Sequence, residues 1–219
     1  MNEALQMRMV GGDTAEILLY GDIGKPMGGV SALAFVEKLK ALGKPQTITL
    51  RIHSEGGDVF DSLAIYNMLS RHPARIEVQI DGIALSAATL VMMAGDRIRI
   101  ARDGQVMVHA PWTWTSGTAA ELRQRADRLD ALQASVVQIY ARRTKLPEAR
   151  VSELLDAETW MDPAQALKLG FVDEITGAER IAAHLDRDRY RNAPSDLLSP
   201  PKSPPRLAVY RDKLGALKG

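Results

Sequence analysis

The stretch RIEVQIDGIALSAATLVMMAG, residues 75–95, contains the pattern that decides the fold. Its first part, residues 75–82, alternates polar and apolar side chains, which is typical of a half-buried β-strand. Its second part, residues 84–95, is a run of small and apolar residues that ends at a glycine, which indicates a short buried helix. Because a strand that leads straight into a helix is the repeating unit of α/β proteins, this stretch predicts that fold class.

Similar strand-helix units lie on both sides of this stretch. Before it, two strand patterns are each followed by a helical pattern, at residues 15–23, 31–42, 47–54 and 55–72. After it come two short strand patterns and a long amphipathic helix, at residues 97–101, 105–110 and 117–144. Crossovers of this length connect parallel strands, so we expect an α/β fold with a mostly parallel sheet covered by helices.

Composition excludes several kinds of protein. The 219 residues are 46% hydrophobic and 25% charged, and the net charge of +1 gives no reason to expect a specific nucleic-acid partner. The absence of cysteine excludes disulfides, thiolate metal sites and a cysteine nucleophile. Residues 1–13 lack a secretory-signal pattern, and apolar runs end before the ~18 residues that a membrane span needs. We therefore expect a cytoplasmic protein without a membrane partner.

The chain divides into three segments by composition. An N-terminal segment, residues 1–15, precedes the strand-helix units, which form one domain at residues 16–178. Residues 179–219 are rich in proline and basic residues and include SPPKSPP at 199–205. Because dense proline interrupts helices and sheet ladders alike, we expect the C-terminal segment to be a flexible tail.

Ser86 is the one serine in the apolar stretch ALSAATLVMMAG. Such a serine is either a small packing or helix-capping residue, or a nucleophile held in a dry pocket. A nucleophilic serine needs a base, and His109 ends the apolar strand pattern VMVHAP just before a proline turns the chain. This position suits a base at the mouth of a site, while the alternative is a hydrogen-bonded core histidine.

Gly56 and Gly57 follow the strand pattern of residues 47–54 and precede a helix. Glycine lets the backbone approach a ligand closely, and N–H groups at a helix start attract negative charge. The pair therefore suits an oxyanion, although by itself such a pair is more often a tight strand-to-helix turn.

Four segments occur in the order LRIHSEGGDVFDSLAIYNML, DGIALSAATLVMMAGD, VMVHAPW and ETWMDPAQALKLGFVDEI. Together they resemble the proteolytic subunits of the Clp family of serine peptidases over residues 16–178. HAPWTWTSGTAAELR and DAETWMDPAQALKLGFVDE are most similar to the Clp-like head maturation proteases of tailed phages and prophages. The resemblance implies the Clp/crotonase-like fold.

The resemblance also implies a catalytic triad. It assigns the nucleophile to Ser86, the general base to His109 and the acid to Glu158, where Clp subunits proper have aspartate. Asp156 is the alternative acid. No lysine lies between Lys44 and Lys145, which disfavours the serine-lysine dyad of related signal-peptide peptidases.

The oxyanion hole and the substrate-binding turn follow from the same resemblance. The N–H groups of Gly57 and Ala87 form the oxyanion hole, and Gly56 with Glu55 shapes the substrate cleft. Glu55 departs from the family, which usually has proline before the glycines. We therefore expect altered cleavage preference.

The implied activity is that of a serine endopeptidase without a cofactor or metal. The implied role is processing of phage capsid and scaffold proteins during head maturation, in the bacterial cytoplasm or inside the procapsid. The resemblance further implies a homo-oligomeric ring, a heptamer or double ring, formed through the helix at residues 117–144. No equivalent of the pore loop that Clp subunits use with their ATPase is recognisable, so we expect no ATPase partner.

Two other functions fit the same fold. A crotonase-type CoA enzyme uses paired backbone N–H groups to hold a thioester enolate, but it does not need a serine-histidine pair. A Clp-fold scaffolding component of a capsid could retain the fold with weak or no catalysis. Ser86 and His109 in matching motifs favour the peptidase.

Overall fold

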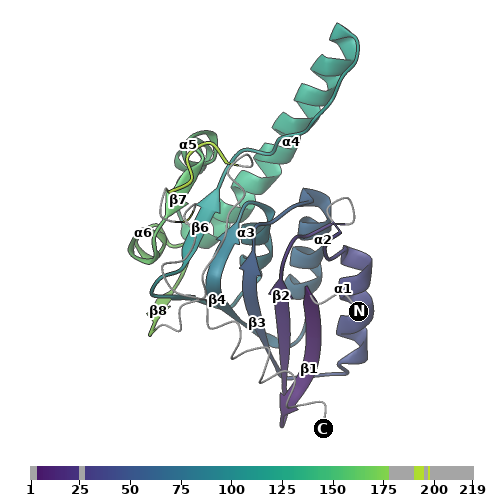
Figure 1. Ribbon diagram of the computed structural model, residues 1–219, viewed down its shortest axis with the longest axis vertical. Helices are drawn as coiled ribbons and strands as arrows, with labels where there is room; N and C mark the ends of the chain where they lie inside the picture. Colours follow the sequence, from purple (N-terminus) through teal and green to yellow (C-terminus); the bar gives the residue numbers. More distant parts are fainter. Residues whose placement is uncertain (1–3, 25–27, 178–189, 195–196, 198–219) are drawn as a thin grey trace.

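The computed structural model describes residues 4–24, 28–177, 190–194 and 197. The elements alternate along the chain much as the sequence predicts (Figure 1). In chain order they are β1 (Leu5–Gly11), β2 (Thr14–Tyr20), α1 (Ala32–Ala41), β3 (Thr47–Ser54), α2 (Val59–Ser70), β4 (Arg75–Leu85), α3 (Ala87–Met92), β5 (Arg97–Ala101), β6 (Gln105–Val108), α4 (Ala119–Thr144), α5 (Glu148–Asp156), β7 (Thr159–Met161), α6 (Pro163–Lys168) and β8 (Glu174–Thr176).

The strands form one sheet in the order β1-β2-β3-β4-β5-β8, and β6 and β7 branch from the end of β4. Most neighbouring strands are parallel: β2-β3, β3-β4, β4-β5, β5-β8 and β4-β6. The antiparallel pairs are β1-β2 and β6-β7. The predicted α/β fold with a mostly parallel sheet is therefore confirmed. Strand β1 lies within residues 1–15, the predicted N-terminal segment, and extends the sheet by pairing with β2.

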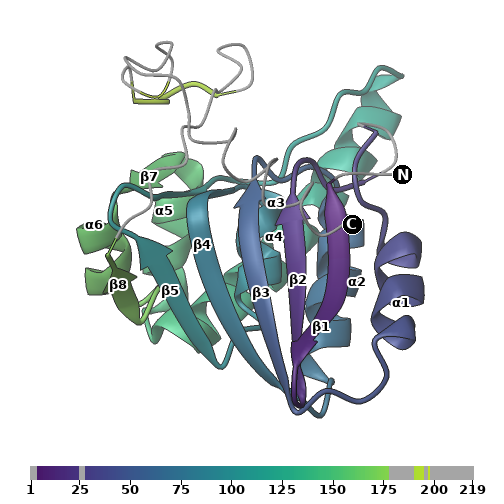
Figure 2. The same ribbon diagram turned by 60° about the horizontal axis from the view of Figure 1, so that its bottom comes forward.

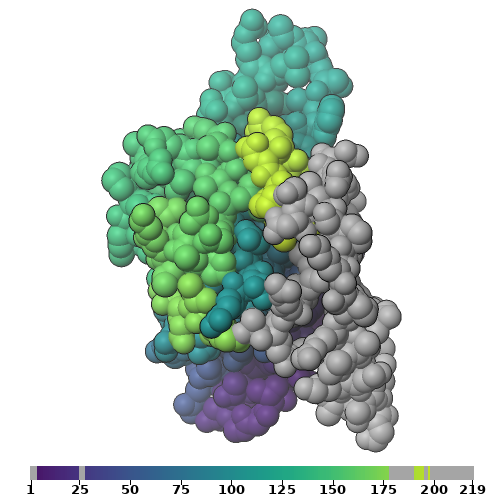
Figure 3. Space-filling model, turned by 60° about the vertical axis from the view of Figure 1, so that its left-hand side comes forward, coloured from purple at the N-terminus to yellow at the C-terminus, as the bar shows by residue number. Residues whose placement is uncertain are grey.

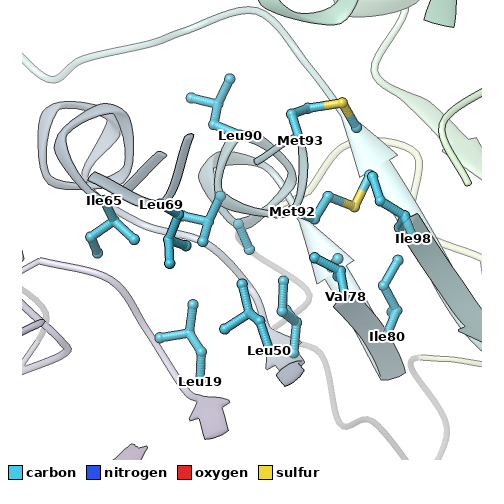
Figure 4. Packing of buried hydrophobic residues seen from close by; sticks show 14 of the residues in the cluster. Leu19, Leu50, Ile65, Leu69, Val78, Ile80, Leu90, Met92, Met93 and Ile98 are labelled. Atoms are coloured by element: carbon cyan, nitrogen blue, oxygen red, sulfur yellow. The ribbon is translucent and has the colours of Figure 1, made fainter. Parts of the chain in front are cut away.

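The hydrophobic core lies between one face of the sheet and the helices. Strand β3 alternates, with Ile48, Leu50 and Ile52 fully buried toward the helices and the residues between them partly exposed on the other face. In Figure 4, Leu19, Leu50, Val78 and Ile80 of the strands face the side chains of Ile65, Leu69, Leu90 and Met92 of α2 and α3. All residues of α3 are buried, so α3 anchors the middle of the sheet (Figure 2).

Helix α4 is only partly packed on the domain. Its buried residues, Val136, Val137, Ile139 and Tyr140, lie in the C-terminal half, while Leu122 near the start is 41% exposed. In Figure 1 the N-terminal half projects beyond the body of the domain. A capping box between Thr118 and Glu121 fixes the helix start, so the helix begins two residues later than the sequence analysis placed it.

The described part of the predicted tail, yellow in Figure 3, lies against the rest of the domain. Tyr190 is 7% exposed, and it packs with Ala193 and Leu197 in a small apolar cluster. The rest of the predicted flexible tail lies outside the described residues. Within the described ranges, no helix has the length and apolar character to cross a membrane.

Candidate active site

Ser86 lies in the sharp turn between β4 and α3. Its φ of 52° is in a region that residues with a side chain rarely adopt, at a cost of about 1–3 kcal/mol. Its N–H donates to the carbonyl of Met107 in β6 at 2.8 Å, which ties the turn to the neighbouring strand. Ser86 occupies the N-cap position of α3, yet within the described residues its side chain does not cap the helix. The turn instead presents the hydroxyl at the end of the strand.

Buried hydrogen bonds from α3 and α4 hold the Ser86 turn in place. The Thr89 hydroxyl donates to the Ser86 carbonyl at 2.5 Å and shares a hydrogen bond of 2.6 Å with the hydroxyl of Tyr140 in α4. Burial raises the pKa of Tyr140, so this hydroxyl stays neutral at ordinary pH. The strained turn is therefore linked to the buried half of α4.

His109 follows directly after β6 and faces Ser86. The parallel pairing of β4 with β6 aligns Leu85 with Met107, which brings the ends of the two strands together. The Ser86 hydroxyl oxygen and His109 Nε2 are 2.7 Å apart, and the Ala110 N–H donates to the Leu155 carbonyl at 3.0 Å. The structure therefore brings together the predicted nucleophile and base, at hydrogen-bonding distance.

Glu158 directly precedes β7, the strand that pairs with the end of β6. The antiparallel pairing of β6 with β7 aligns Val108 with Thr159, the residues next in sequence to His109 and Glu158. Glu158 is 4% exposed and has a φ of 49°, so a tight turn directs it inward. Its carboxylate accepts hydrogen bonds from Trp160 Nε1 at 3.3 Å and from the Asn192 N–H at 2.7 Å.

Asp156, the alternative acid, lies elsewhere. It is exposed at the end of α5, and its carboxylate accepts a hydrogen bond of 2.9 Å from Gln133 of α4. This carboxylate therefore faces the helix surface, whereas that of Glu158 is buried and accepts hydrogen bonds from Trp160 and Asn192.

The Gly56-Gly57 turn contacts the Ser86 turn directly. The φ values of the two glycines are 90° and 136°, which favour glycine. A Cβ on Gly56 would lie 2.5 Å from the Leu85 carbonyl oxygen and 2.8 Å from the Ala87 nitrogen. Within the described residues, neither the Gly57 nor the Ala87 N–H donates to a backbone carbonyl. Glu55, the residue before this turn, contacts the C-terminal segment through its carbonyl and carboxylate oxygens.

Two buried ionisable groups lie on the strands that lead to the site. Burial lowers the pKa of His53, near the end of β3, to about 4, so this histidine is neutral at pH 7. Burial raises the pKa of Asp81 in β4, and this rise is opposed by the guanidinium of Arg51, which donates two hydrogen bonds to the carboxylate. In the described part of the chain, no group of three or more His, Asp or Glu side chains is arranged to hold a metal ion.

Sequence reasoning missed three contacts of the site. Thr89, Glu158 and Trp160 lie within quoted motifs, and Tyr140 lies within the predicted helix of residues 117–144. Nothing in these patterns indicates the hydrogen bond between Thr89 and Tyr140 or that between Trp160 and Glu158. Asn192 lies in the predicted tail, and the sequence there carries no signal for contact with Glu158.

Comparison with known proteins decides the family. The family model for Clp protease matches residues 13–179, a range that contains Ser86, His109 and Glu158. The chain belongs to the Clp protease family. As a member of that family it is a serine-type peptidase.

Curated Clp relatives match over most of their length. The chain is 28% identical over 163 residues to the ATP-dependent Clp protease proteolytic subunit of Deinococcus radiodurans, covering 72% of this chain and 80% of the relative. It is 29% identical over 177 residues to proteolytic subunit 3 of Rhodococcus jostii, with coverages of 79% and 87%. It is 26% identical over 178 residues to proteolytic subunit 2 of Treponema denticola, with coverages of 80% and 86%.

Proposed function

We propose that this Clp family member is a serine endopeptidase with Ser86 as nucleophile, His109 as general base and Glu158 as the acid that orients the histidine. The observation that carries the proposal is the 2.7 Å contact between the Ser86 hydroxyl and His109 Nε2, at the tip of a strained turn. The buried position of Glu158, directly before the strand that pairs with β6, supports its role over that of Asp156.

The proposed reaction begins when the Ser86 oxygen attacks a peptide carbonyl and its proton moves to His109 Nε2. The carbonyl oxygen becomes an oxyanion, and the Gly57 and Ala87 N–H groups donate hydrogen bonds to it. His109 then gives the proton to the leaving amine, and the C–N bond breaks to leave an acyl-enzyme. Water attacks this ester after giving its proton to His109, which returns the proton to Ser86 as the acid product leaves.

The acid acts through the histidine in this scheme. A carboxylate beside the imidazole holds the tautomer whose Nε2 can accept the serine proton, and it stabilises the imidazolium that forms. Glu158 is suited to this role because the turn at Glu158 and its hydrogen bond from Trp160 fix the carboxylate inside the protein.

Labelling with a fluorophosphonate probe tests this function. The probe phosphonylates an activated serine, so we expect one labelled peptide that contains Ser86, and loss of labelling in His109→Ala. A capsid scaffold without catalysis, or a crotonase-type CoA enzyme, would leave Ser86 unlabelled. Labelling of a different serine would contradict the assignment of the nucleophile.

The oligomeric state belongs to the same proposal. We infer a homo-oligomeric ring, a heptamer or a pair of stacked rings, in which the projecting half of α4 contacts neighbouring subunits. The exposed Leu122 and the absence of domain packing around this half, among the described residues, support such a contact. Light scattering should give a mass several times the 24.0 kDa of one chain, and a monomer at working concentration would contradict the ring.

The biological role that we propose is processing of capsid and scaffold proteins during head maturation of a phage or prophage. It is supported by the similarity of the segments around His109 and Glu158 to phage head maturation proteases. Procapsids assembled from the coat and scaffold proteins encoded beside this chain should be cleaved by the active protein and remain whole with Ser86→Ala. Cleavage of unrelated unfolded proteins at equal rate would argue for a general peptidase.

A further inference from the structure

The C-terminal segment Tyr190–Asn192 packs against the apolar sheet surface beside the catalytic residues. The Tyr190 side chain is buried against Ile83 and Leu85 of β4 and Met107 of β6, which point away from the main core. Trp160 of β7 closes the side of this surface, with its ring edge-on to Tyr190 at a centroid distance of 5.3 Å. We call these four residues, Ile83, Leu85, Met107 and Trp160, the aromatic subsite.

The same segment contacts both sides of the proposed catalytic cleft. On one side, the Tyr190 hydroxyl donates to the carbonyl of Glu55 at 3.0 Å, next to the glycine turn. On the other side, the Asn192 N–H donates to the Glu158 carboxylate at 2.7 Å, and Asn192 Nδ2 donates to the Ala157 carbonyl at 3.1 Å. Between these contacts, the Tyr190 ring lies 6.5 Å from the His109 ring. Three consecutive residues therefore cross from the oxyanion side to the acid side.

These contacts resemble those of a bound peptide. In peptide recognition, a backbone N–H supplies directional hydrogen bonds while a side chain fills a pocket. Tyr190 supplies the side chain and Asn192 supplies the N–H, two residues further along, and an edge-on aromatic pair adds specificity to the apolar contact. A segment that only covered apolar surface would not need to reach both Glu55 and Glu158.

We propose that the aromatic subsite binds an aromatic residue of an extended polypeptide, and that the chain's own Tyr190–Asn192 occupies it and restricts access to Ser86. The proposal rests on the proposed peptidase function, because it names the substrate feature that the same cleft would accept. A polypeptide substrate must displace the segment before its scissile bond reaches Ser86.

Access to Ser86 can be measured in the full-length protein by the rate of fluorophosphonate labelling. We expect Tyr190→Ala to be labelled at least several-fold faster than the parent, because the apolar anchor is lost. Asn192→Pro, which removes the N–H donor, should act in the same direction. Leu33→Ala, which removes an exposed apolar side chain of α1, is the matched control and should be labelled at the parental rate. Unchanged or slower labelling in Tyr190→Ala and Asn192→Pro, with native circular dichroism, would overturn the proposal.

Binding to the subsite can be measured without catalysis. A fluorescent peptide with the sequence RDRYRNAPSDL of residues 187–197 should bind the full-length double variant Ser86→Ala, Tyr190→Ala in fluorescence anisotropy. The same peptide with alanine in place of its tyrosine should bind at least about tenfold more weakly, since an aromatic anchor carries much of such affinity. Equal binding of the two peptides, or none, would overturn the subsite.

The two measurements separate this inference from the peptidase function. If the tyrosine peptide binds selectively but no variant is labelled at Ser86, the subsite stands and the peptidase function fails. If Ser86 is labelled equally in all variants and neither peptide binds, the peptidase function stands and the subsite fails.

Discussion

Two strand-to-helix junctions lie side by side in this protein. Both turn the chain sharply through residues with positive φ, but they use different residue types to do so. The junction after β3 uses Gly56 and Gly57, and the junction after β4 uses Ser86, yet all three residues have positive φ. A Cβ on Gly56 would come within 3.0 Å of the Ser86 Cβ. The first junction therefore has glycines without side chains, and this leaves room for the serine side chain of the second junction. In the proposed reaction, the glycines contribute their backbone N–H groups and the space left by their missing side chains, whereas the serine contributes its hydroxyl.

The largest effect should come from removing that hydroxyl. Ser86→Ala keeps the Cβ and the turn but loses the proposed nucleophile, so peptide cleavage should fall by ~10⁴-fold or more. Circular dichroism and thermal unfolding should remain close to those of the parent. Cleavage at the parental rate by purified Ser86→Ala would show that the second junction is merely structural.

Glu158→Gln should have the next largest effect. A neutral amide lacks the negative charge that, in the proposed scheme, stabilises the imidazolium of His109 and fixes its tautomer. We expect kcat to fall by on the order of 10³-fold. Asp156→Asn is the matched control: its carboxylate bonds Gln133 on the helix surface, so kcat should change little. Equal and mild losses in both variants, measured with the same fluorogenic peptide, would indicate a serine-histidine dyad.

Gly57→Ala tests whether the first junction acts through its backbone. The added Cβ would lie 2.1 Å from the Ile23 carbonyl oxygen, so the turn must shift and its N–H must move. Displacing one oxyanion donor should lower kcat by about 10²-fold.

The control for Gly57→Ala is Gly11→Ala. Gly11 has the same φ of 136°, but a Cβ there would meet no atom within 4 Å. This substitution adds backbone strain without a clash, so it should lower stability slightly and leave kcat unchanged. Similar losses of kcat in both variants would mean that strain, rather than the position of the N–H, governs the effect.

The smallest effect concerns the histidine near the end of β3. His53 is neutral when folded because burial lowers its pKa to about 4, whereas in the unfolded chain it titrates near 6.5. Protonation of His53 therefore favours unfolding. The contribution of neutral His53 to the free energy of unfolding is fully present above about pH 6.5, and on the order of 3 kcal/mol is lost as the pH falls toward about 4. Urea unfolding at pH 7 and at pH 4.5 should show a smaller loss in His53→Gln than in the parent. An identical loss in both would show that other groups carry the pH dependence.

The sequence predicted those parts of the fold that depend on local patterns. Alternation in β3 and the apolar run through α3 are visible in single segments, and the ends of neighbouring parallel strands must meet at one edge of the sheet. Ser86 and the Gly56-Gly57 turn could therefore be placed near one another from the chain order alone. The resemblance to Clp subunits added the pairing with His109.

Contacts between distant segments could not be predicted in this way. Strand β1 was missed although residues 5–9 alternate apolar and polar side chains. Only Leu5 of this strand is buried, and the strand joins the sheet by pairing with β2. The choice between Glu158 and Asp156 depends on where α5 ends and how the chain turns into β7, which propensities do not determine. Tyr190 contacts Glu55 across 135 positions, and a proline-rich neighbourhood gave no sign of it.

The buried Thr89–Tyr140 hydrogen bond makes α4 a lever arm whose inner end is coupled to the turn that carries Ser86. The 26-residue helix is about 39 Å long at 1.5 Å per residue, and Tyr140 sits close to its inner end. A small tilt imposed on the projecting tip would be transmitted mechanically through Tyr140 and Thr89 to the Ser86 carbonyl, because close-packed interiors yield little to local strain. A load on the projecting end of α4 would thus change the alignment of the Ser86 hydroxyl, the proposed nucleophile, some tens of ångströms away.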